Sequence, residues 1–183
     1  MKLILGFLSF IAFAIASALG HSEVGLLAGA LIAGRFVVRD WVSPAQRMKL
    51  LDIGTFVLFG ALAIFVWASG VVLSIAVVRL CVDTGLLLIV LTTILIGKPF
   101  TMDYAKQSVD PTLWRSATFI RNNQVIALAW AGAFAAIVLA DIALWRGSIP
   151  TRAVGLIIAG SVYAAMRFTE WYSRHTRDLA ALH

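Results

Sequence analysis

Long runs of apolar residues, separated by short polar breaks, fill most of the chain. A helix needs about 20 predominantly apolar residues to cross the hydrocarbon core of a bilayer. Runs near that length predict six transmembrane helices, at about residues 2–19, 24–38, 51–67, 71–96, 122–145 and 151–171. We therefore expect an all-α, polytopic membrane helix bundle that forms a single integral membrane domain over residues 1–183.

The first apolar run has two interpretations. It ends in Ala16-Ser17-Ala18, which resembles a signal-peptidase site, so a cleaved signal peptide is one alternative. We expect instead that the run is retained as the first membrane span, followed by a tight turn at Gly20.

The polar stretch at residues 100–121 differs from the other breaks, because it is long and interleaves aromatic with charged residues. Asp110 followed by Pro111 is typical of a helix cap with proline in the first turn. This pattern predicts an amphipathic surface segment of two short pieces, broken near residues 109–111. Anchoring by an aromatic belt is the simpler role, and contact with lipid headgroups or a partner is the other. The candidate contact residues are Phe100, Tyr104 and Trp114.

Composition supports a membrane location. Apolar residues make up 61% of the chain and charged residues 13%, and the mean hydropathy is +0.95. Soluble domains are usually about 45–50% apolar and about 25% charged, so the numbers exclude a soluble enzyme, a disordered chain and a disulfide-stapled module. The lone Cys81 and the dispersed His21, His175 and His183 provide no cluster of metal ligands, so we expect no metal and no cofactor.

The basic residues are distributed as expected for a membrane protein with a defined orientation. The formal net charge is +6, but the basic residues flank apolar runs instead of forming a stripe, so we expect no binding to nucleic acid. On one side of the expected membrane lie Lys2, Arg35, Arg39, Arg47, Lys49, Lys98, Lys106, Arg115, Arg121, Arg167, Arg174 and Arg177. On the other side lie Arg146 and Arg152. This bias predicts that both termini are cytoplasmic.

Charged residues inside the apolar runs are the candidates for chemistry. Arg79 and Asp83 are four residues apart and therefore share one face of a helix. A charge within a bilayer is costly and usually faces the bundle interior, a partner or a water-filled cavity. We interpret the pair as a site for an ion, a proton or an anionic substrate, with an internal salt bridge that fixes helix packing as the alternative. Asp52 and Asp141 are further candidates for this pathway.

Some of these positions also have structural interpretations. Asp52 stands where a carboxylate complements a helix N-terminus, and Asp141 is close enough in sequence to pair with the outer arginines. Arg167 and Glu170 are three residues apart near the inner end of the last span, which predicts an interfacial ion pair. Small residues four apart predict a face for close helix packing, formed by Gly25, Gly29 and Ala33.

Enzyme motifs are missing from the sequence. It contains no G-x-S-x-G, no H-E-x-x-H and no phosphate-binding loop. Serine, cysteine and histidine do not cluster as a nucleophile and its base would. We therefore expect a protein that is not an enzyme.

From residue 98 onward the chain resembles the bacterial intracellular septation protein A family. That family has Lys-Pro after a long span, a polar segment with a tryptophan, and an Asn-led span with Ala-Trp. The matching positions are Lys98, Pro99, Trp114, Asn123, Ala129 and Trp130, over about a third of the chain, with longer spacings after Trp114 and Asn123 than in the family. The segment at 99–105 is also similar to a Pro-Phe-Thr-x-x-Tyr-Ala segment of uncharacterised six-span bacterial inner-membrane proteins. The first resemblance implies a role in envelope or division-site organisation.

Three classes of function fit these observations. The first is a transporter or channel for an ion or small solute, in the lipid bilayer and as a homo-oligomer, that uses the Arg79–Asp83 pair. The second is a non-catalytic scaffold or assembly factor that binds a membrane protein partner in an envelope or cell-division complex. The third, a binding subunit of a vitamin transporter, is suggested by size and six spans alone.

Overall fold

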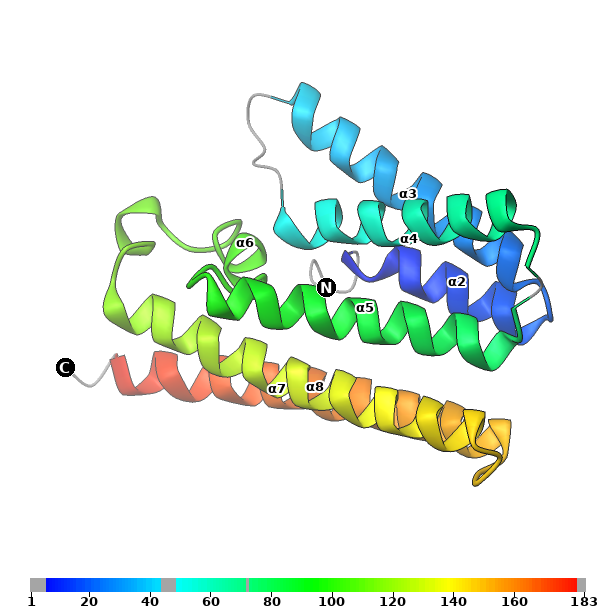
Figure 1. Ribbon diagram of the computed structural model, residues 1–183. Helices are drawn as coiled ribbons and strands as arrows, with labels where there is room; N and C mark the ends of the chain where they lie inside the picture. Colours follow the sequence, from blue (N-terminus) through cyan, green and yellow to red (C-terminus); the bar gives the residue numbers. More distant parts are fainter. Residues whose placement is uncertain (1–5, 44–48, 72, 181–183) are drawn as a thin grey trace. The chain divides into compact units, whose positions relative to one another are not determined.

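The computed structural model describes residues 6–43, 49–71 and 73–180 (Figure 1). Residues 1–5, 44–48, 72 and 181–183 lie outside the described residues, and so do the start of the first expected span and the basic residues Lys2 and Arg47. The described ranges contain seven α-helices, one 3-10 helix and no strand, which confirms the all-α prediction. The chain forms two compact units, Met1–Ile89 and Val90–His183.

In its described residues, the first unit contains three helices and most of a fourth. They are α2 (Leu8–Ala18), α3 (Ser22–Val42), α4 (Leu50–Ser69) and α5 (Ile75–Leu95), whose last residues belong to the second unit. The expected turn at Gly20 is present, and Gly70 caps the end of α4. Both glycines have the left-handed backbone (φ 86° and 64°) that residues with a side chain rarely adopt.

The phenyl ring of Phe59 joins the helices of the first unit. This fully buried side chain of α4 packs against Phe10 and Phe13 of α2, with ring centroids 5.1 and 5.7 Å apart. On α3 the ring meets Gly29, where a Cβ atom would lie 2.7 Å from Phe59 Cδ1. The glycine therefore lets α3 and α4 approach closely.

Glycine also sets the contact between α4 and α5 within this unit. A Cβ atom on Gly54 would lie 2.9 Å from Ile89 Cγ2, and one on Gly85 would clash with Leu58. Each glycine thus accepts a branched side chain from the facing helix, which is the small-residue packing that membrane helices commonly use.

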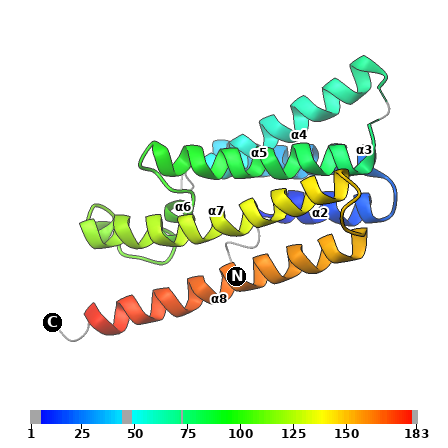
Figure 2. The ribbon, with the colours of Figure 1, turned by 60° about the horizontal axis from the view of Figure 1, so that its bottom comes forward.

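The second unit is built around a pair of long antiparallel helices, α7 (Ala117–Trp145) and α8 (Thr151–Ala180), which lie side by side in both views (Figures 1 and 2). The turn between them contains Gly147 in the left-handed conformation, with φ 72°. Trp130 is buried in this pair, and its indole nitrogen donates a hydrogen bond to Thr169 Oγ1 at 3.0 Å.

Two short helices, α6 (Thr101–Ala105) and the 3-10 helix η1 (Pro111–Leu113), precede α7. Asp110 caps η1 by accepting a hydrogen bond from the Thr112 backbone nitrogen at 2.9 Å, and Pro111 opens the helix. The two-piece segment and its capped break therefore match the sequence pattern. Thr101 Oγ1 fixes α6 to α7 by donating to the Asn123 carbonyl oxygen at 2.8 Å.

Three helices in the described part of the chain are long and apolar enough to cross a membrane, namely α4, α5 and α7. The described length of α2 makes it a shorter apolar helix. Charged residues interrupt α3 near its end and α8 in its second half. An integral membrane location is thus compatible with the structure, whereas the full six-span topology is not confirmed and belongs with the proposals below.

Candidate functional site

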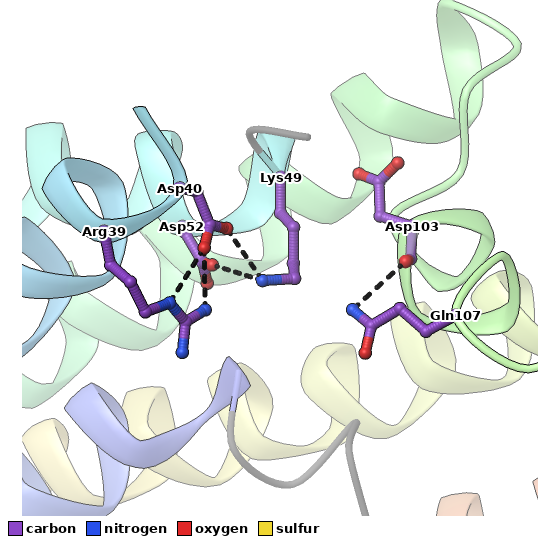
Figure 3. Close-up of polar contacts among 6 residues, drawn as sticks. All are labelled: Arg39, Asp40, Lys49, Asp52, Asp103 and Gln107. Atoms are coloured by element: carbon purple, nitrogen blue, oxygen red, sulfur yellow. Dashed lines mark hydrogen bonds and ion pairs between the residues drawn. The ribbon is translucent and has the colours of Figure 1, made fainter. Parts of the chain in front are cut away.

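Four charged residues meet where α3 ends and α4 begins, and we call them the charge cluster. Arg39 and Asp40 lie in the last turn of α3, Lys49 directly precedes α4, and Asp52 lies in the first turn of α4 (Figure 3). The helix dipoles favour Arg39 near the end of α3 and Asp52 near the start of α4, whereas Asp40 and Lys49 lie at the ends that disfavour their charge.

The ammonium group of Lys49 lies between two carboxylates. Its Nζ atom donates to Asp40 Oδ2 at 2.8 Å and to Asp52 Oδ2 at 3.4 Å. Arg39 completes the cluster through its Nη2 and Nε atoms, which lie 2.7 and 2.9 Å from Asp40 Oδ1. Lys49 therefore bridges two helices, and Asp40 is held by two cations.

Burial distinguishes the members of the charge cluster. The side chains of Lys49, Asp40 and Asp52 are 8%, 1% and 6% exposed, whereas that of Arg39 is 47% exposed. Removing charged groups from water is costly unless they are paired. The charges of the two cations and two anions sum to zero. The ion pairs within the charge cluster therefore offset the desolvation cost of its three buried members.

The pKa of Asp40 reflects two opposed effects. Burial raises the pKa of the carboxyl group, while the hydrogen bonds and positive charges of Lys49 and Arg39 lower it by more. The net result is a pKa below the ordinary 3.8. Asp40, which lies beyond the expected span at residues 24–38, is therefore held as a carboxylate.

This arrangement places the Lys49 ammonium cation between two carboxylates. Carboxylate oxygens are hard ligands that suit alkali metal ions and protons, and the Lys49 ammonium occupies the position between two such oxygens. Its contact with Asp52 is 0.6 Å longer than its contact with Asp40, from 3.4 and 2.8 Å. Asp52 therefore makes the weaker of the two contacts with Lys49.

The four residues expected to form an ion pathway lie on three helices. Asp52 belongs to the charge cluster. Arg79 and Asp83 lie one turn apart on α5, both half-buried. Asp141 is fully buried on α7, in the second unit.

The expected packing residues Gly25, Gly29 and Ala33 are all buried on α3. In addition to the contact of Gly29 with α4, a Cβ atom on Gly25 would lie 3.1 Å from Ala16 Cβ of α2. The small face of α3 therefore packs within the first unit. On α8, Arg167 Nη1 lies 3.3 Å from Glu170 Oε2 in an exposed ion pair.

The aromatic residues expected at the surface are placed differently from one another. Phe100 is fully buried and Tyr104 is 8% exposed, with their ring centroids 6.5 Å apart. Trp114 is half-buried, and its indole nitrogen donates to the Val109 carbonyl oxygen at 2.9 Å. The hydrogen bond from Thr101 holds α6 on α7, and this packing differs from the expected surface contact for Phe100 and Tyr104.

Sequence reasoning singled out Asp52 but not its partners Asp40 and Lys49. The available signal was a pair of opposite charges that flank a short break between two consecutive apolar runs. Consecutive antiparallel helices joined by a short connection bring such flanking residues together. The same pattern therefore predicts an ion pair across the connection.

Comparisons of this chain with protein-family models, with curated proteins and with solved structures find no match. The resemblance to the septation protein family therefore stays a prediction. The chemistry of the charge cluster is the basis for a function.

Proposed function

We propose that this protein is a six-span inner-membrane transporter or channel for a small monovalent cation or a proton, with the charge cluster as the cation-binding site. Three helices of the described chain have the length and apolar character of membrane spans. The helices α2, α3 and α8 overlap the remaining expected spans, and α2 is the shortest of them. The bias of basic residues supports a topology with both termini and the charge cluster on the cytoplasmic side.

The observation that carries this proposal is the buried Lys49 ammonium between Asp40 and Asp52. A purely structural ion pair gains little, because well-packed apolar residues of similar volume are often as stabilising. Asp52 lies at the start of the expected span at residues 51–67, and charged side chains within membrane segments usually mark ion or proton pathways. A cluster of three buried charges, with one longer and weaker contact, fits an exchangeable cation site.

The chemistry of the cluster suggests an exchange step. A cation entering from the cytoplasmic side binds Asp52 and displaces the Lys49 ammonium, which keeps its shorter contact with Asp40. Arg39 stabilises the Asp40 carboxylate throughout. Arg79 and Asp83 on α5 then provide a second charged position along the pathway.

Cation binding can be tested by thermal unfolding of the purified protein, followed by tryptophan fluorescence. Lithium, sodium and potassium chloride are compared with N-methylglucamine chloride at constant ionic strength. A bound ligand stabilises the folded state by about 2.7 kcal/mol at 100 times its Kd. We expect one alkali cation to raise the melting temperature of the wild-type protein by roughly 5 °C.

The Asp52→Asn variant should lose this cation-dependent shift relative to its own baseline. Asp110→Asn is the matched control, because Asp110 is exposed, lies outside the charge cluster, and asparagine also caps helices. The proposal is contradicted if no cation shifts the wild-type melting temperature, or if Asp52→Asn keeps the same shift.

A second candidate function is a scaffold or assembly factor for an envelope or cell-division complex. It is favoured by an exposed stripe of basic and aromatic residues on α8, formed by Arg167, Trp171, Arg174 and His175. Native mass spectrometry of the protein from lipid nanodiscs made directly from host membranes separates the two proposals. A stoichiometric second protein supports the scaffold, whereas a bound small molecule or a defined homo-oligomer supports transport.

A further inference from the structure

A cavity lies within the first unit, at the end of the α3–α4 pair opposite to the charge cluster. Its volume is about 300 Å³, and its walls include Glu23, Leu26 and Leu27 of α3 and Val66 and Trp67 of α4. Glu23 and Asp40 are 17 residues apart on α3, which corresponds to about 25 Å along the helix. The cavity is therefore distinct from the charge cluster.

The cavity combines one negative charge with apolar walls. Glu23 is the charged residue among the described residues that line it, and the others are apolar or glycine. Glu23 lies in the first turn of α3, where acidic residues are common because of the helix dipole. The dipole alone accounts for an acid at this position, but it does not account for an apolar cavity beside that acid.

Trp67 adds a recognition element for a cation. Its side chain lines the cavity and is 87% exposed. A cation near the face of tryptophan is attracted by the ring quadrupole, and quaternary ammonium groups are commonly recognised in this way. A volume near 300 Å³ is at the lower end of ligand pockets, which suits one small ligand.

We infer that this cavity binds an amphiphilic organic ammonium ion, with the cation at Glu23 and Trp67 and the apolar group against Leu26, Leu27 and Val66. Charge complementarity selects the cation, and the apolar walls exclude a fully hydrated metal ion. The ammonium group could come from a phosphatidylethanolamine headgroup or from a free organic cation, and the test distinguishes these two sources. Binding here does not depend on transport through the charge cluster.

The test is isothermal titration of benzyltrimethylammonium into the protein in dodecylmaltoside, a detergent without charge or ammonium groups. We expect saturable binding at one site. Glu23→Gln should weaken binding at least tenfold, and Trp67→Leu should weaken it roughly 3- to 10-fold because the cation–π contact is lost. Glu170→Gln is the matched control, since it removes the chain's other glutamate from an exposed site on α8 and should leave binding unchanged.

Neopentylbenzene provides a second control, because it has the shape of benzyltrimethylammonium without the charge. Equal binding of the two compounds, equal binding by wild type and Glu23→Gln, or absent binding by the wild type would overturn the inference. Asp52→Asn should bind benzyltrimethylammonium as the wild type does. A failure of the cation transport proposal can therefore be distinguished from a failure of this inference. Competition by phosphatidylethanolamine but not by phosphatidylglycerol supports the lipid source, and lack of competition supports a free organic cation.

Discussion

At the scale of single residues, Lys49 is the central member of the charge cluster, because its ammonium group contacts one carboxylate from each of two helices. Its distances to Asp40 Oδ2 and Asp52 Oδ2 are 2.8 and 3.4 Å. All three side chains are at most 8% exposed, so little water can replace a missing partner. Removing the ammonium would therefore leave two buried carboxylates with Arg39 as the remaining cation of the charge cluster.

We predict that Lys49→Met destabilises the folded protein by about 3–5 kcal/mol, because it leaves buried charges uncompensated. The measurement is the melting temperature by tryptophan fluorescence, which should fall by roughly 10 °C. Adding Asp52→Asn to this variant should recover part of the loss, since it removes one uncompensated charge.

Lys98→Met is the control for this prediction, because Lys98 is exposed between α5 and α6 and lies outside the charge cluster. An unchanged melting temperature in Lys49→Met would contradict the structural account of the cluster. So would an equal fall in Lys98→Met.

The lowered pKa of Asp40 predicts a pH-dependent contribution to stability. Because the pKa in the folded state lies below the ordinary 3.8, the carboxylate stabilises the fold fully at pH values above 3.8. The contribution is lost as the pH falls through the lowered pKa. The melting-temperature difference between wild type and Asp40→Asn should thus be equal at pH 7 and pH 5.5 and shrink below pH 3.8. A difference that grows on acidification would be inconsistent with this sign.

Single residues were only partly predictable from the sequence. Asp52 was a candidate because it interrupts an apolar run, and the same reasoning selected Arg79, Asp83 and Asp141. This reasoning does not select Lys49, because lysines that flank an apolar run usually only mark the cytoplasmic side. Its burial depends on the meeting of two helix ends, and that is a tertiary feature absent from a one-dimensional pattern.

Close helix packing at glycines is the main feature at the scale of elements. Gly29 of α3 receives the ring of Phe59 from α4, and a Cβ atom there would lie 2.7 Å from Phe59 Cδ1. The ring is fully buried and also contacts two phenylalanines of α2, so it has little freedom to move away. Even one added methyl group would therefore separate α3 from α4.

We predict that Gly29→Ala lowers the stability of the protein by about 1–3 kcal/mol through overpacking. Gly60→Ala is the matched control, because no described atom lies within 4 Å of its built Cβ atom. That variant should be neutral or more stable by up to about 1 kcal/mol, owing to helix propensity. Thermal unfolding of both variants checks the prediction, and a neutral Gly29→Ala would show that the ring can shift.

Helix positions were predictable because apolar runs and glycine breaks are local signals. The exact ends of the helices were less predictable. The helix expected from residue 122 begins at Ala117, where Ser116 Oγ accepts a hydrogen bond from the Phe119 backbone nitrogen at 3.2 Å. The last helix continues to Ala180 because α8 becomes amphipathic beyond its apolar part, and such a sequence can stay helical outside a bilayer.

At the scale of the whole molecule, membrane insertion is the property that the sequence predicts best. Hydropathy depends on composition within a window, and α4, α5 and α7 meet the requirements for a span. Topology depends on the arrangement of charge along the entire chain, and it stays a proposal. In the proposed topology, the charge cluster lies on the cytoplasmic side and the cavity beside Glu23 lies on the opposite side.

Cysteine labelling tests the proposed topology in a Cys81→Ser background, since Cys81 is the only cysteine in the sequence. Ser148→Cys, between α7 and α8, should react with a membrane-impermeant maleimide added to the outer face of the inner membrane. Ser108→Cys, between α6 and η1, should react only after permeabilisation. Reversed labelling, or labelling of both sites from outside, would refute cytoplasmic termini.

The most direct measurement is cation flux in proteoliposomes that contain a trapped pH-sensitive dye and a fluorescent cation indicator. We predict that a gradient of the cation that stabilises the wild-type protein drives flux well above that of empty liposomes. Asp52→Asn should reduce this flux at least tenfold, while Asp110→Asn should match the wild type. Absence of flux in the wild type, or equal flux in Asp52→Asn, would contradict the role of the charge cluster as a transported-cation site.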